Sequence, residues 1–492
     1  HKTLHSPFTV EEKPIPFLKV NEFYKYLGTN KNLQTFQDLN VITSKFKSYL
    51  EKLTNSYLFP YMKLQILKIY LLPMLDFKFK TTQLRIDELK YLDRFVKSHI
   101  RSWYRLPAST SSAFFQIPNA LGGLGVRNLT SDYKALRLSS TISLFQSKDD
   151  RVVTLACEGL KGAIRRRTPD HIESPNPITF LNSDEKLLTK VRDVRSMFTC
   201  LRGQRQMLQI KFKNLTDDCY DIDIDPTSLT KPPSVFNTKF TPTRIKLLRW
   251  HQQAIAFDEF KQLSLQGQTS HAYSMDKCSN SWIRNGQIKV RTAQFGLHAR
   301  LNVLPTMNIL KKLNLVSTTN CRHCSSPNES LSHVLNACPY NASLIRLRHN
   351  NILYMIAEKI KLNKHKILFV DSTFIEGFER RPDIVLLNEW NNTAYIIELT
   401  IPYESSIQRL EQVREAKIGK YAEETEYLQR LGFTVQNKCL VFGSLGSHLK
   451  SNFEIYKILG ISKRQTKFLK KAITSHILED GYAVYKHHMN NK

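Results

Sequence analysis

Acidic residues are scarce in this chain of 492 residues. Its 43 Asp and Glu face 72 Lys and Arg, so the formal net charge is +29. A charge of this size indicates a polyanionic partner rather than general solubility. Hydrophobic residues at 41% and aromatic residues at 10% supply enough apolar surface for packed cores, which excludes a disordered basic tail.

Long hydrophobic runs are also missing. The best one, Ile66–Phe77, is shorter than the roughly 18 residues that a membrane-spanning helix needs. Lys68, Pro73 and Asp76 interrupt it as well. The first residues, His1–Thr3, include neither an initiator Met nor the apolar start of a secretory signal, so we interpret the chain as a fragment. Without an amphipathic anchor or a lipidation motif, the expected polyanion is nucleic acid and not a membrane.

Cysteine is too sparse for a disulfide scaffold, because the chain holds eight in 492 residues. Three of the eight crowd into one stretch and, with a histidine, give the spacing C-x2-C-x8-H-x4-C. The four residues are Cys321, Cys324, His333 and Cys338. Four such ligands match a tetrahedral Zn²⁺ and leave no position for a substrate, so we expect a structural zinc site. His323, inside the first pair, is interpreted as a bystander.

Helical spacing of leucines predicts helices over residues 33–105, and residues 132–215 are also expected to be mainly helical. Residues 216–243, with an acidic cluster and several prolines, are interpreted as a linker that contains a domain boundary. The glycine-rich segment 118–125 is interpreted as a structural turn and not as a phosphate-binding loop, because no clear strand precedes it.

Basic side chains gather where we expect contacts with nucleic-acid phosphates. The candidates in the helical region are Arg165, Arg166, Arg167, Arg192, Arg195, Arg202 and Arg205. A second stripe near the C-terminus comprises Lys463, Arg464, Lys467, Lys470 and Lys471. The alternative is a solvated helix face without a partner.

Two expected strands near the C-terminus carry a pair of carboxylates. Residues 381–387 and 394–400 are strand-like and are joined by turn residues, which predicts a hairpin. If the midpoint lies between Trp390 and Asn391, Asp383 faces Glu398 with about 4.5–5.5 Å between their Cβ atoms. Two carboxylates at that distance need a cation, and Mg²⁺ takes ligands of this kind. Solvent-facing acids on an ordinary hairpin are the alternative.

A helix expected over residues 405–430 adds a lysine. Lys417 lies on its apolar stripe, where an unpaired ammonium is costly, so it needs a negative partner such as the carboxylate pair. Lys420, at the edge of the stripe, is the alternative lysine, and Glu424 is an alternative, purely structural partner. Two carboxylates, Mg²⁺ and a lysine together suit phosphodiester hydrolysis.

Several segments, in their order along the chain, resemble one family. It comprises the non-LTR retrotransposable element polyproteins with a C-terminal restriction-like endonuclease, such as those that insert into ribosomal RNA genes. Residues 23–28 resemble the end of a reverse-transcriptase palm, and residues 63–73 resemble its thumb helix. The other matching segments are the glycine-rich turn at 118–125, Trp282–Gly286, Arg291, Leu304–Thr306, the zinc spacing, Arg348–Asn350, Arg381–Asp383, Glu398 and Lys417–Tyr421.

The resemblance implies an order of domains. The end of the palm would occupy residues 1–30, the thumb 31–120, a helical basic connector 121–315, a zinc knuckle 316–345 and a restriction-like endonuclease 346–492. The expected fold class is therefore a multidomain chain that is mainly α-helical over its N-terminal two thirds, with a small zinc knuckle and an α/β restriction-endonuclease-like C-terminal domain.

The resemblance also implies residue roles. Asp383 and Glu398 would bind Mg²⁺, and Lys417 or Lys420 would complete the catalytic site. The family usually has a lysine where this chain has Thr400, so the lysine must come from the helix.

Two further roles come from the segment ahead of the hairpin. His349 would be an accessory catalytic or nucleic-acid contact, and Arg348 a nucleic-acid contact. Glu398 departs from the Asp that many members have at its position.

The implied activity is Mg²⁺-dependent nicking of target double-stranded DNA in the nucleus, where the exposed 3′ end primes reverse transcription of the element RNA. The catalytic aspartates of the polymerase would lie in the N-terminal remainder of the polyprotein, so this chain alone is not expected to polymerise DNA. The rival interpretation is a non-catalytic nucleic-acid-binding module whose nuclease core has decayed.

Overall fold

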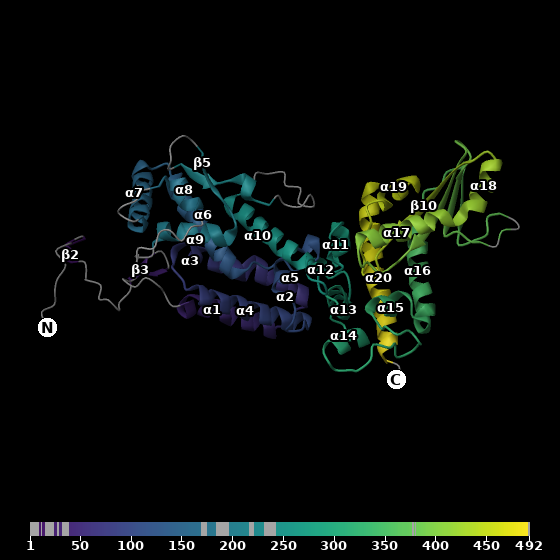
Figure 1. The fold of residues 1–492 in the computed structure, drawn as a ribbon, viewed down its shortest axis with the longest axis horizontal. Coiled ribbons are helices and arrows are strands. Elements are labelled where there is room, and N and C mark those ends of the chain that lie inside the picture. Colours follow the sequence, from purple (N-terminus) through teal and green to yellow (C-terminus); the bar gives the residue numbers. More distant parts are fainter. Residues whose placement is uncertain are drawn as a thin grey trace. The chain divides into compact units, whose positions relative to one another are not determined.

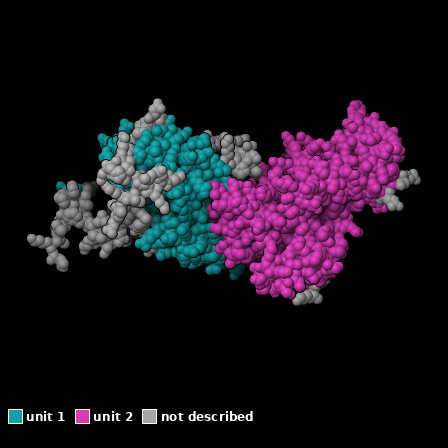
Figure 2. All heavy atoms as spheres, in the orientation of Figure 1, with its two compact units in different colours: residues 1–58, 63–100, 127–254 teal, residues 59–62, 101–126, 255–492 magenta. Residues whose placement is uncertain are grey.

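The computed structural model divides the chain into two compact units, which Figure 2 colours separately. Unit 1 comprises residues 1–58, 63–100 and 127–254, and unit 2 comprises residues 59–62, 101–126 and 255–492. The structure describes residues 39–168, 175–183, 196–215, 221–230, 243–375, 378 and 380–490, with short strand segments before residue 32. The division falls inside helix α10 (Arg244–Lys261) and not in the expected linker.

Helices follow two short ladders at the start of the chain, as the leucine spacing predicts (Figure 1). The ladders pair β1 (Thr9–Val10) with β2 (Lys13–Pro14) and β3 (Tyr24–Tyr26) with β4 (Thr29–Lys31). The helices are α1 (Leu39–Asn55), α2 (Pro60–Ile66), the π-helical η1 (Leu67–Leu71), the 3-10 turn η2 (Leu72–Leu75), α3 (Asp76–Thr81) and α4 (Ile86–Tyr104). The leucines that predicted them, Leu64, Leu67, Leu89 and Leu92, are buried.

In the part of unit 1 that the structure describes after residue 127, the chain is helical apart from one small hairpin. Its elements are α6 (Leu129–Phe145), α7 (Asp150–Arg167), α8 (Pro177–Asn182), α9 (Met197–Leu208), β5 (Phe212–Asn214), β6 (Ile222–Ile224), η4 (Pro226–Ser228) and α10. The linker interpretation is wrong for residues 221–230, because β6 pairs with β5 and buries Ile222 and Ile224 in the core. Acidic residues alternate there with buried isoleucines, which is the period of a half-buried strand.

Short helices begin unit 2 around the glycine-rich turn. They are α5 (Ser112–Gln116), η3 (Asn119–Leu121), α11 (Ser270–Tyr273), η5 (Lys277–Asn280), α12 (Trp282–Asn285), α13 (Val290–Arg300) and α14 (Met307–Lys312). Gly122 has a φ of +95°, and a Cβ there would lie 2.3 Å from the Tyr273 ring. The turn is thus a close packing of backbone against a ring, in agreement with a structural role for Gly122.

The C-terminal part of unit 2 is a mixed four-stranded sheet with helices around it. The strands β7 (Lys366–Val370), β8 (Ile384–Asn388), β9 (Thr393–Thr400) and β10 (Thr434–Val441) lie in the order β10-β9-β8-β7, with only β9 and β10 parallel. The helices are α15 (Leu331–Asn336), η6 (Pro339–Asn341), α16 (Ala342–Ala357), α17 (Ile407–Ile418), η7 (Gly419–Tyr421), α18 (Ala422–Arg430), α19 (Asn452–Ile458) and α20 (Lys463–Asn490). Among the described residues, no helix has the length and apolarity that crossing a bilayer requires.

One core joins the sheet to the helices. Ile384 of β8, Ile397 of β9 and Leu440 of β10 pack with Ile352 of α16 and Ile473 of α20. The expected helix over residues 405–430 is correct in extent but wrong in continuity, because the 3-10 turn η7 separates α17 from α18.

A buried histidine makes this core sensitive to acid. His448 is 1% exposed and contacts the Thr474 hydroxyl with its Nε2, at 2.8 Å. Burial lowers the pKa of His448 to about 4 against the opposing charge of Asp276. In the unfolded chain the pKa of this histidine is near 6.5. Between pH 6.5 and pH 4 the unfolded chain therefore binds a proton that the folded chain does not, which favours unfolding. The stability that the neutral ring supplies is present above pH 6.5 and is lost as the pH falls through 4.

We therefore expect the free energy of unfolding to fall by about 2 kcal/mol between pH 7 and pH 5 through this one group. Urea denaturation at both values measures it. In the His448→Gln variant the fall should shrink by that amount, whereas replacement of the exposed His271 should change nothing. An identical pH response in parent and His448→Gln would contradict the assignment.

Candidate functional site

The hairpin of β8 and β9 brings the two predicted carboxylates together. Ile384 pairs with Ile397 and Asn388 with Thr393, which is the register predicted from the turn residues. One step beyond this ladder Asp383 stands opposite Glu398. The backbone N–H of Leu399 donates to the Asp383 Oδ2 at 2.6 Å, so the end of β9 fixes the aspartate.

Glu398 is 4% exposed and lies at the centre of a charged cluster. Lys417 Nζ lies 3.2 Å from its Oε2, and Lys420 Nζ lies 3.1 Å from its Oε1. The Tyr421 hydroxyl also donates to Oε1. A buried carboxylate needs such partners, because desolvation disfavours its charge.

The break between α17 and α18 explains why two lysines reach one carboxylate. A regular helix would turn residues three apart by about 300°, so their side chains would diverge by about 60°. The 3-10 turn at Gly419–Tyr421 tightens the backbone, and in 3-10 geometry residues three apart eclipse. Lys417 and Lys420 therefore both contact Glu398, and which of them would complete a catalytic site stays a prediction.

His349 of α16 contacts Asp383, the other carboxylate of the pair. Its Nε2 lies 3.4 Å from Asp383 Oδ2 and 3.1 Å from the Leu399 carbonyl oxygen. Burial alone would lower the pKa of His349, but the hydrogen bond and charge of Asp383 raise it to about 9. The ring is therefore a cation at neutral pH, and three positive groups face two carboxylates.

One other predicted partner, Glu424, lies elsewhere. Glu424 is fully buried, and its cationic partner is Arg380, whose Nη1 lies 3.7 Å from Oε2. Glu424 is thus not the structural partner of the lysines. From the sequence, Tyr421 was named only within the segment Lys417–Tyr421 that resembles the family. Its hydrogen bond to Glu398 was not predicted, because an aromatic ring at helical spacing indicates packing first.

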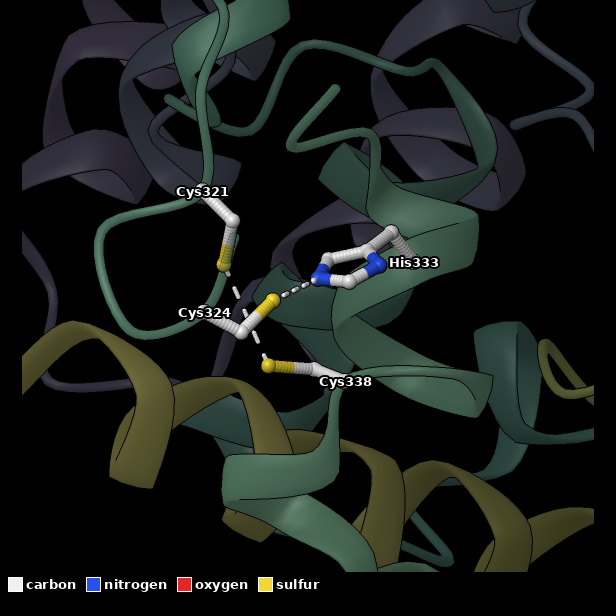
Figure 3. A group of neighbouring side chains, drawn as sticks. All are labelled: Cys321, Cys324, His333 and Cys338. Atoms are coloured by element: carbon white, nitrogen blue, oxygen red, sulfur yellow. Dashed lines mark hydrogen bonds between the residues drawn. The ribbon is translucent and has the colours of Figure 1, made fainter. Parts of the chain in front are cut away.

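The predicted zinc ligands form a tight group (Figure 3). Cys321 Sγ lies 3.9 Å from Cys338 Sγ, and Cys324 Sγ lies 3.4 Å from His333 Nε2. All four ligand atoms lie within 4.8 Å of one another. Zn–S bonds of about 2.3 Å in a tetrahedron separate the sulfurs by about 3.8 Å, so the group fits a structural Zn²⁺.

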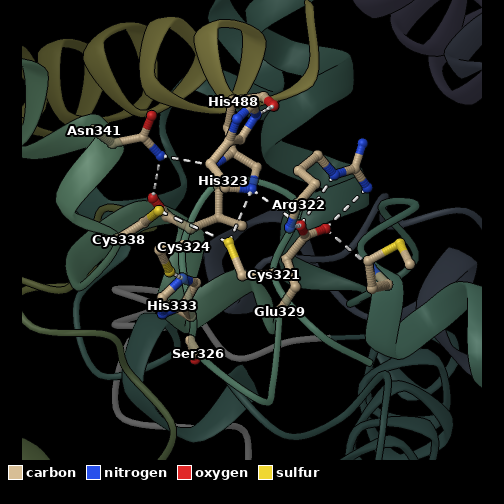
Figure 4. A network of polar contacts seen from close by, with 12 residues as sticks. Cys321, Arg322, His323, Cys324, Ser326, Glu329, His333, Cys338, Asn341 and His488 are labelled. Atoms are coloured by element: carbon tan, nitrogen blue, oxygen red, sulfur yellow. Dashed lines mark hydrogen bonds and ion pairs between the residues drawn. The ribbon is translucent and has the colours of Figure 1, made fainter. Parts of the chain in front are cut away.

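A hydrogen-bonded network ties this group to the last turns of α20 (Figure 4). His488 is fully buried, and its Nε2 lies 3.9 Å from Cys321 Sγ and 3.2 Å from Glu329 Oε2. Asn341 Nδ2 contacts the other ring nitrogen at 3.1 Å. A protonated Nε2 facing both the sulfur and the carboxylate is the arrangement of a residue that orients a metal ligand.

Glu329 belongs to the network, but its oxygens are already hydrogen-bonded. Cys321, Glu329 and His488 are close enough to hold a metal by themselves. However, both Glu329 oxygens accept hydrogen bonds from the Arg322 guanidinium, at 2.9 and 3.0 Å. Burial would raise the pKa of Glu329, but its hydrogen bonds to His488 and Arg322 lower it to about 2.

Stacked rings add a second contact between the cluster and α20. The His323 ring stacks on Tyr340 with 4.0 Å between centroids, and Tyr340 stacks on His487 at 4.6 Å. His323 lies outside the ligand group, in agreement with its interpretation as a bystander to the metal. Its ring contacts the His488 carbonyl at 2.7 Å instead.

The basic candidates separate by burial. Arg205 is 6% exposed, and Arg348 is 1% exposed and donates to the Leu335 carbonyl and the Asn336 side chain. Lys470 is 9% exposed and pairs with Asp276 at 2.7 Å. These burials argue against the nucleic-acid contacts predicted for the three residues. Net charge alone gives no information on which cations face inward.

The other basic candidates stay predictions. Arg165 and Arg166 are exposed at the end of α7, Arg167 is half-buried, and Arg202 donates to the Ser183 carbonyl. Arg192 and Arg195 lie outside the described residues. In the C-terminal stripe Lys463, Arg464 and Lys467 are exposed, and Lys471 is half-buried.

No family model matches the chain, but comparison with known proteins finds several relatives of one kind. Over 481 residues it is 22% identical to the Retrovirus-related Pol polyprotein from type-1 retrotransposable element R2 of Popillia japonica, a match that covers 96% of this chain and 83% of that protein. It is 31% identical over 131 residues to the type-2 element R2DM polyprotein of Drosophila melanogaster, and 29% identical over 122 residues to the type-1 R2 polyprotein of Nasonia vitripennis. The last two matches cover 27% and 25% of this chain but 12% of each relative. The chain is therefore a distant homologue of R2 retrotransposable element Pol polyproteins.

Proposed function

We propose that this chain nicks target double-stranded DNA by metal-dependent phosphodiester hydrolysis, so that the 3′ end primes reverse transcription of an element RNA. The supporting observation is the convergence of Asp383, Glu398, Lys417 and Lys420 on one end of a hairpin. The mixed sheet with flanking helices and the homology to Pol polyproteins agree with a restriction-like endonuclease domain. Nicking of supercoiled plasmid is the test.

The carboxylates suit a magnesium ion. Asp383 and Glu398 lie at one strand end and present the oxygen ligands that Mg²⁺ prefers. They would hold the ion, which when bound polarises a phosphoryl oxygen and lowers the pKa of an attacking water. Glu398 would then exchange some of its contacts with lysine for contacts with the cation.

The neighbouring cations of the chain serve the phosphate. Lys417 and Lys420 are 37% and 43% exposed, so both ammonium groups reach solvent as well as Glu398. Released in part from the carboxylate, they stabilise negative charge that develops on the phosphate. His349, charged at neutral pH, holds Asp383 in place through its 3.4 Å contact. Tyr421 orients Glu398 through its hydrogen bond to the same oxygen that Lys420 contacts.

A pocket of about 270 Å³ in unit 2 supports nucleic-acid binding. Lys467 and Lys471 of α20 line it together with Lys277 and Arg284. None of the residues that line it is acidic. Four cations from distant parts of the sequence suit backbone phosphates of target DNA or element RNA. The proposal also includes a structural Zn²⁺ held by the four-residue cluster. It further includes the N-terminal remainder of a polyprotein as a partner, and action in the nucleus.

The second candidate function is nucleic-acid binding without catalysis. It is favoured by the ion pairs of Glu398, because two lysines already neutralise this carboxylate without a metal. In that case the hairpin cluster is a structural ion network on a decayed nuclease core. Binding of DNA without any nicking is its expected result.

The two lysines give a prediction that separates a catalytic role from a structural one. We expect Lys417→Ala and Lys420→Ala each to lower the nicking rate about 10- to 100-fold, because one ammonium remains near the phosphate. The double variant should lose more, although not the product of both losses, since the two lysines share Glu398. Single-turnover plasmid nicking measures the rates, and Arg409→Ala, an exposed cation on α17, is the control. Full activity in the double variant would rule out this role.

A further inference from the structure

A second pocket of unit 2 combines cations with aromatic rings. Its volume is about 320 Å³, large enough for one nucleotide. Its lining residues are Arg105, Arg291, Gln294, Phe295, His298, Leu304, Tyr482 and Tyr485. None of these is acidic, and Arg105 and Arg291 are exposed. The cations come from two separate segments and the tyrosines from α20.

The aromatic side of the pocket is a group of three packed rings. Phe295 of α13 is 4% exposed and packs its ring 5.5 Å from both Tyr482 and Tyr485. The two tyrosines are only half-buried, so parts of their rings face the open side. A base stacks favourably on such a surface whatever its sequence.

Arg105 is held in an unusual conformation at the edge of this pocket. It follows the last residue of α4 and has a φ of +53°, a position that usually takes Gly or Asn. The N–H of Leu106 closes the helix end on the Arg101 carbonyl at 2.9 Å. His298, which also lines the pocket, lies beside the backbone of Tyr104 and Arg105. Glycine adopts this backbone conformation with less strain than arginine does. An arginine at such a position therefore suggests a function for its guanidinium group.

We infer that this pocket binds one unpaired nucleotide of a single-stranded nucleic acid. The guanidinium groups of Arg105 and Arg291 take the phosphate, the tyrosine rings take the base, and the Gln294 amide takes a base edge. A duplex does not fit this description, because its base faces are covered by their neighbours. The inference goes beyond the proposed nicking and requires no activity of the hairpin cluster.

The test is the affinity of the full chain for labelled single-stranded DNA, single-stranded RNA and blunt duplex DNA, measured by fluorescence anisotropy without Mg²⁺. Arg291→Ala and Tyr482→Leu should each weaken binding of single strands about tenfold and of duplex less than twofold. Arg291→Ala should also flatten the salt dependence of single-strand binding by roughly one phosphate contact. Arg346→Ala and Tyr354→Leu, both exposed on α16, are the matched controls.

Three results would overturn the inference. They are unchanged single-strand binding in both variants, an equal loss for single strands and duplex, and full competition by free AMP at micromolar concentration. If Tyr482→Leu loses its fold by circular dichroism, Gln294→Ala joins Arg291→Ala as the second variant, because both side chains lie on α13 and are not buried. Nicking is not measured, so failure here leaves the proposed nuclease activity untouched, and failure of nicking leaves this pocket untouched.

Discussion

Replacing Asp383 by Asn should lower the nicking rate at least about a thousandfold. The carboxylate is held at the strand end by the Leu399 N–H and faces the only slightly exposed Glu398. Asn retains the shape and can still accept that hydrogen bond, but it removes the charge needed to hold Mg²⁺. Without the metal ion the transition state loses several kcal/mol of stabilisation. Each loss of about 1.4 kcal/mol lowers the rate tenfold, which gives this magnitude. Quantified conversion of supercoiled to open-circular plasmid measures it.

The control for Asp383→Asn is Glu389→Gln, which removes an exposed acid from the turn of the same hairpin. This variant should nick like the parent. Binding of duplex DNA should be equal or slightly tighter in Asp383→Asn, since it loses a negative charge near the phosphate. A rate within about threefold of the parent for Asp383→Asn, a factor worth less than about 1 kcal/mol, would remove the aspartate from the catalytic site.

Cys338→Ser should remove bound zinc and destabilise unit 2 well beyond the cluster itself. Structural Zn²⁺ contributes folding free energy directly, about 10–16 kcal/mol in isolated zinc-finger peptides. Here the cluster also holds the end of α20 through His488 and the stacked rings of His323 and Tyr340. Loss of even about 3 kcal/mol would lower the melting temperature by roughly 6 to 12 °C in a domain of this size.

Metal content by mass spectrometry and thermal unfolding by circular dichroism test this together. Cys200→Ser, a half-buried cysteine of unit 1, should keep both zinc and melting temperature. His488→Ala should keep zinc but lower the melting temperature, because it orients a ligand without being one. If Cys338→Ser retains full zinc, the four-ligand assignment is wrong, and if it loses zinc without any fall in melting temperature, the contact with α20 is not stabilising.

Local patterns were enough to predict the register of the hairpin and the grouping of the four cysteine and histidine side chains. The turn residues around Trp390 and Asn391 set the hairpin register, and because strand side chains alternate, that register fixes which acids share a face. The C-x2-C-x8-H-x4-C spacing likewise brings its four ligands within reach through one loop and one short helix. In both cases fewer than about twenty residues separate the groups, so chain geometry limits the alternatives.

Contacts between distant residues could not be predicted in this way. His488 lies 167 residues from Cys321, and nothing in either segment indicates the other. The turn at Gly419–Tyr421 breaks a helix whose apolar stripe is continuous in sequence, so the convergence of two lysines was hidden. The number of charged residues in the sequence likewise does not show that Arg348 is buried rather than exposed to a phosphate. Its burial depends on how the whole unit packs around it.

The most direct measurement is nicking of a supercoiled plasmid by the purified parent chain, with Mg²⁺ and without it, followed by extension of the nicked strand with an added DNA polymerase. The proposed function predicts open-circular plasmid only with the metal, and a free 3′ hydroxyl that the polymerase extends. Duplex that is bound by the protein but stays supercoiled at saturating Mg²⁺ and protein would contradict the nuclease and leave a nucleic-acid-binding module.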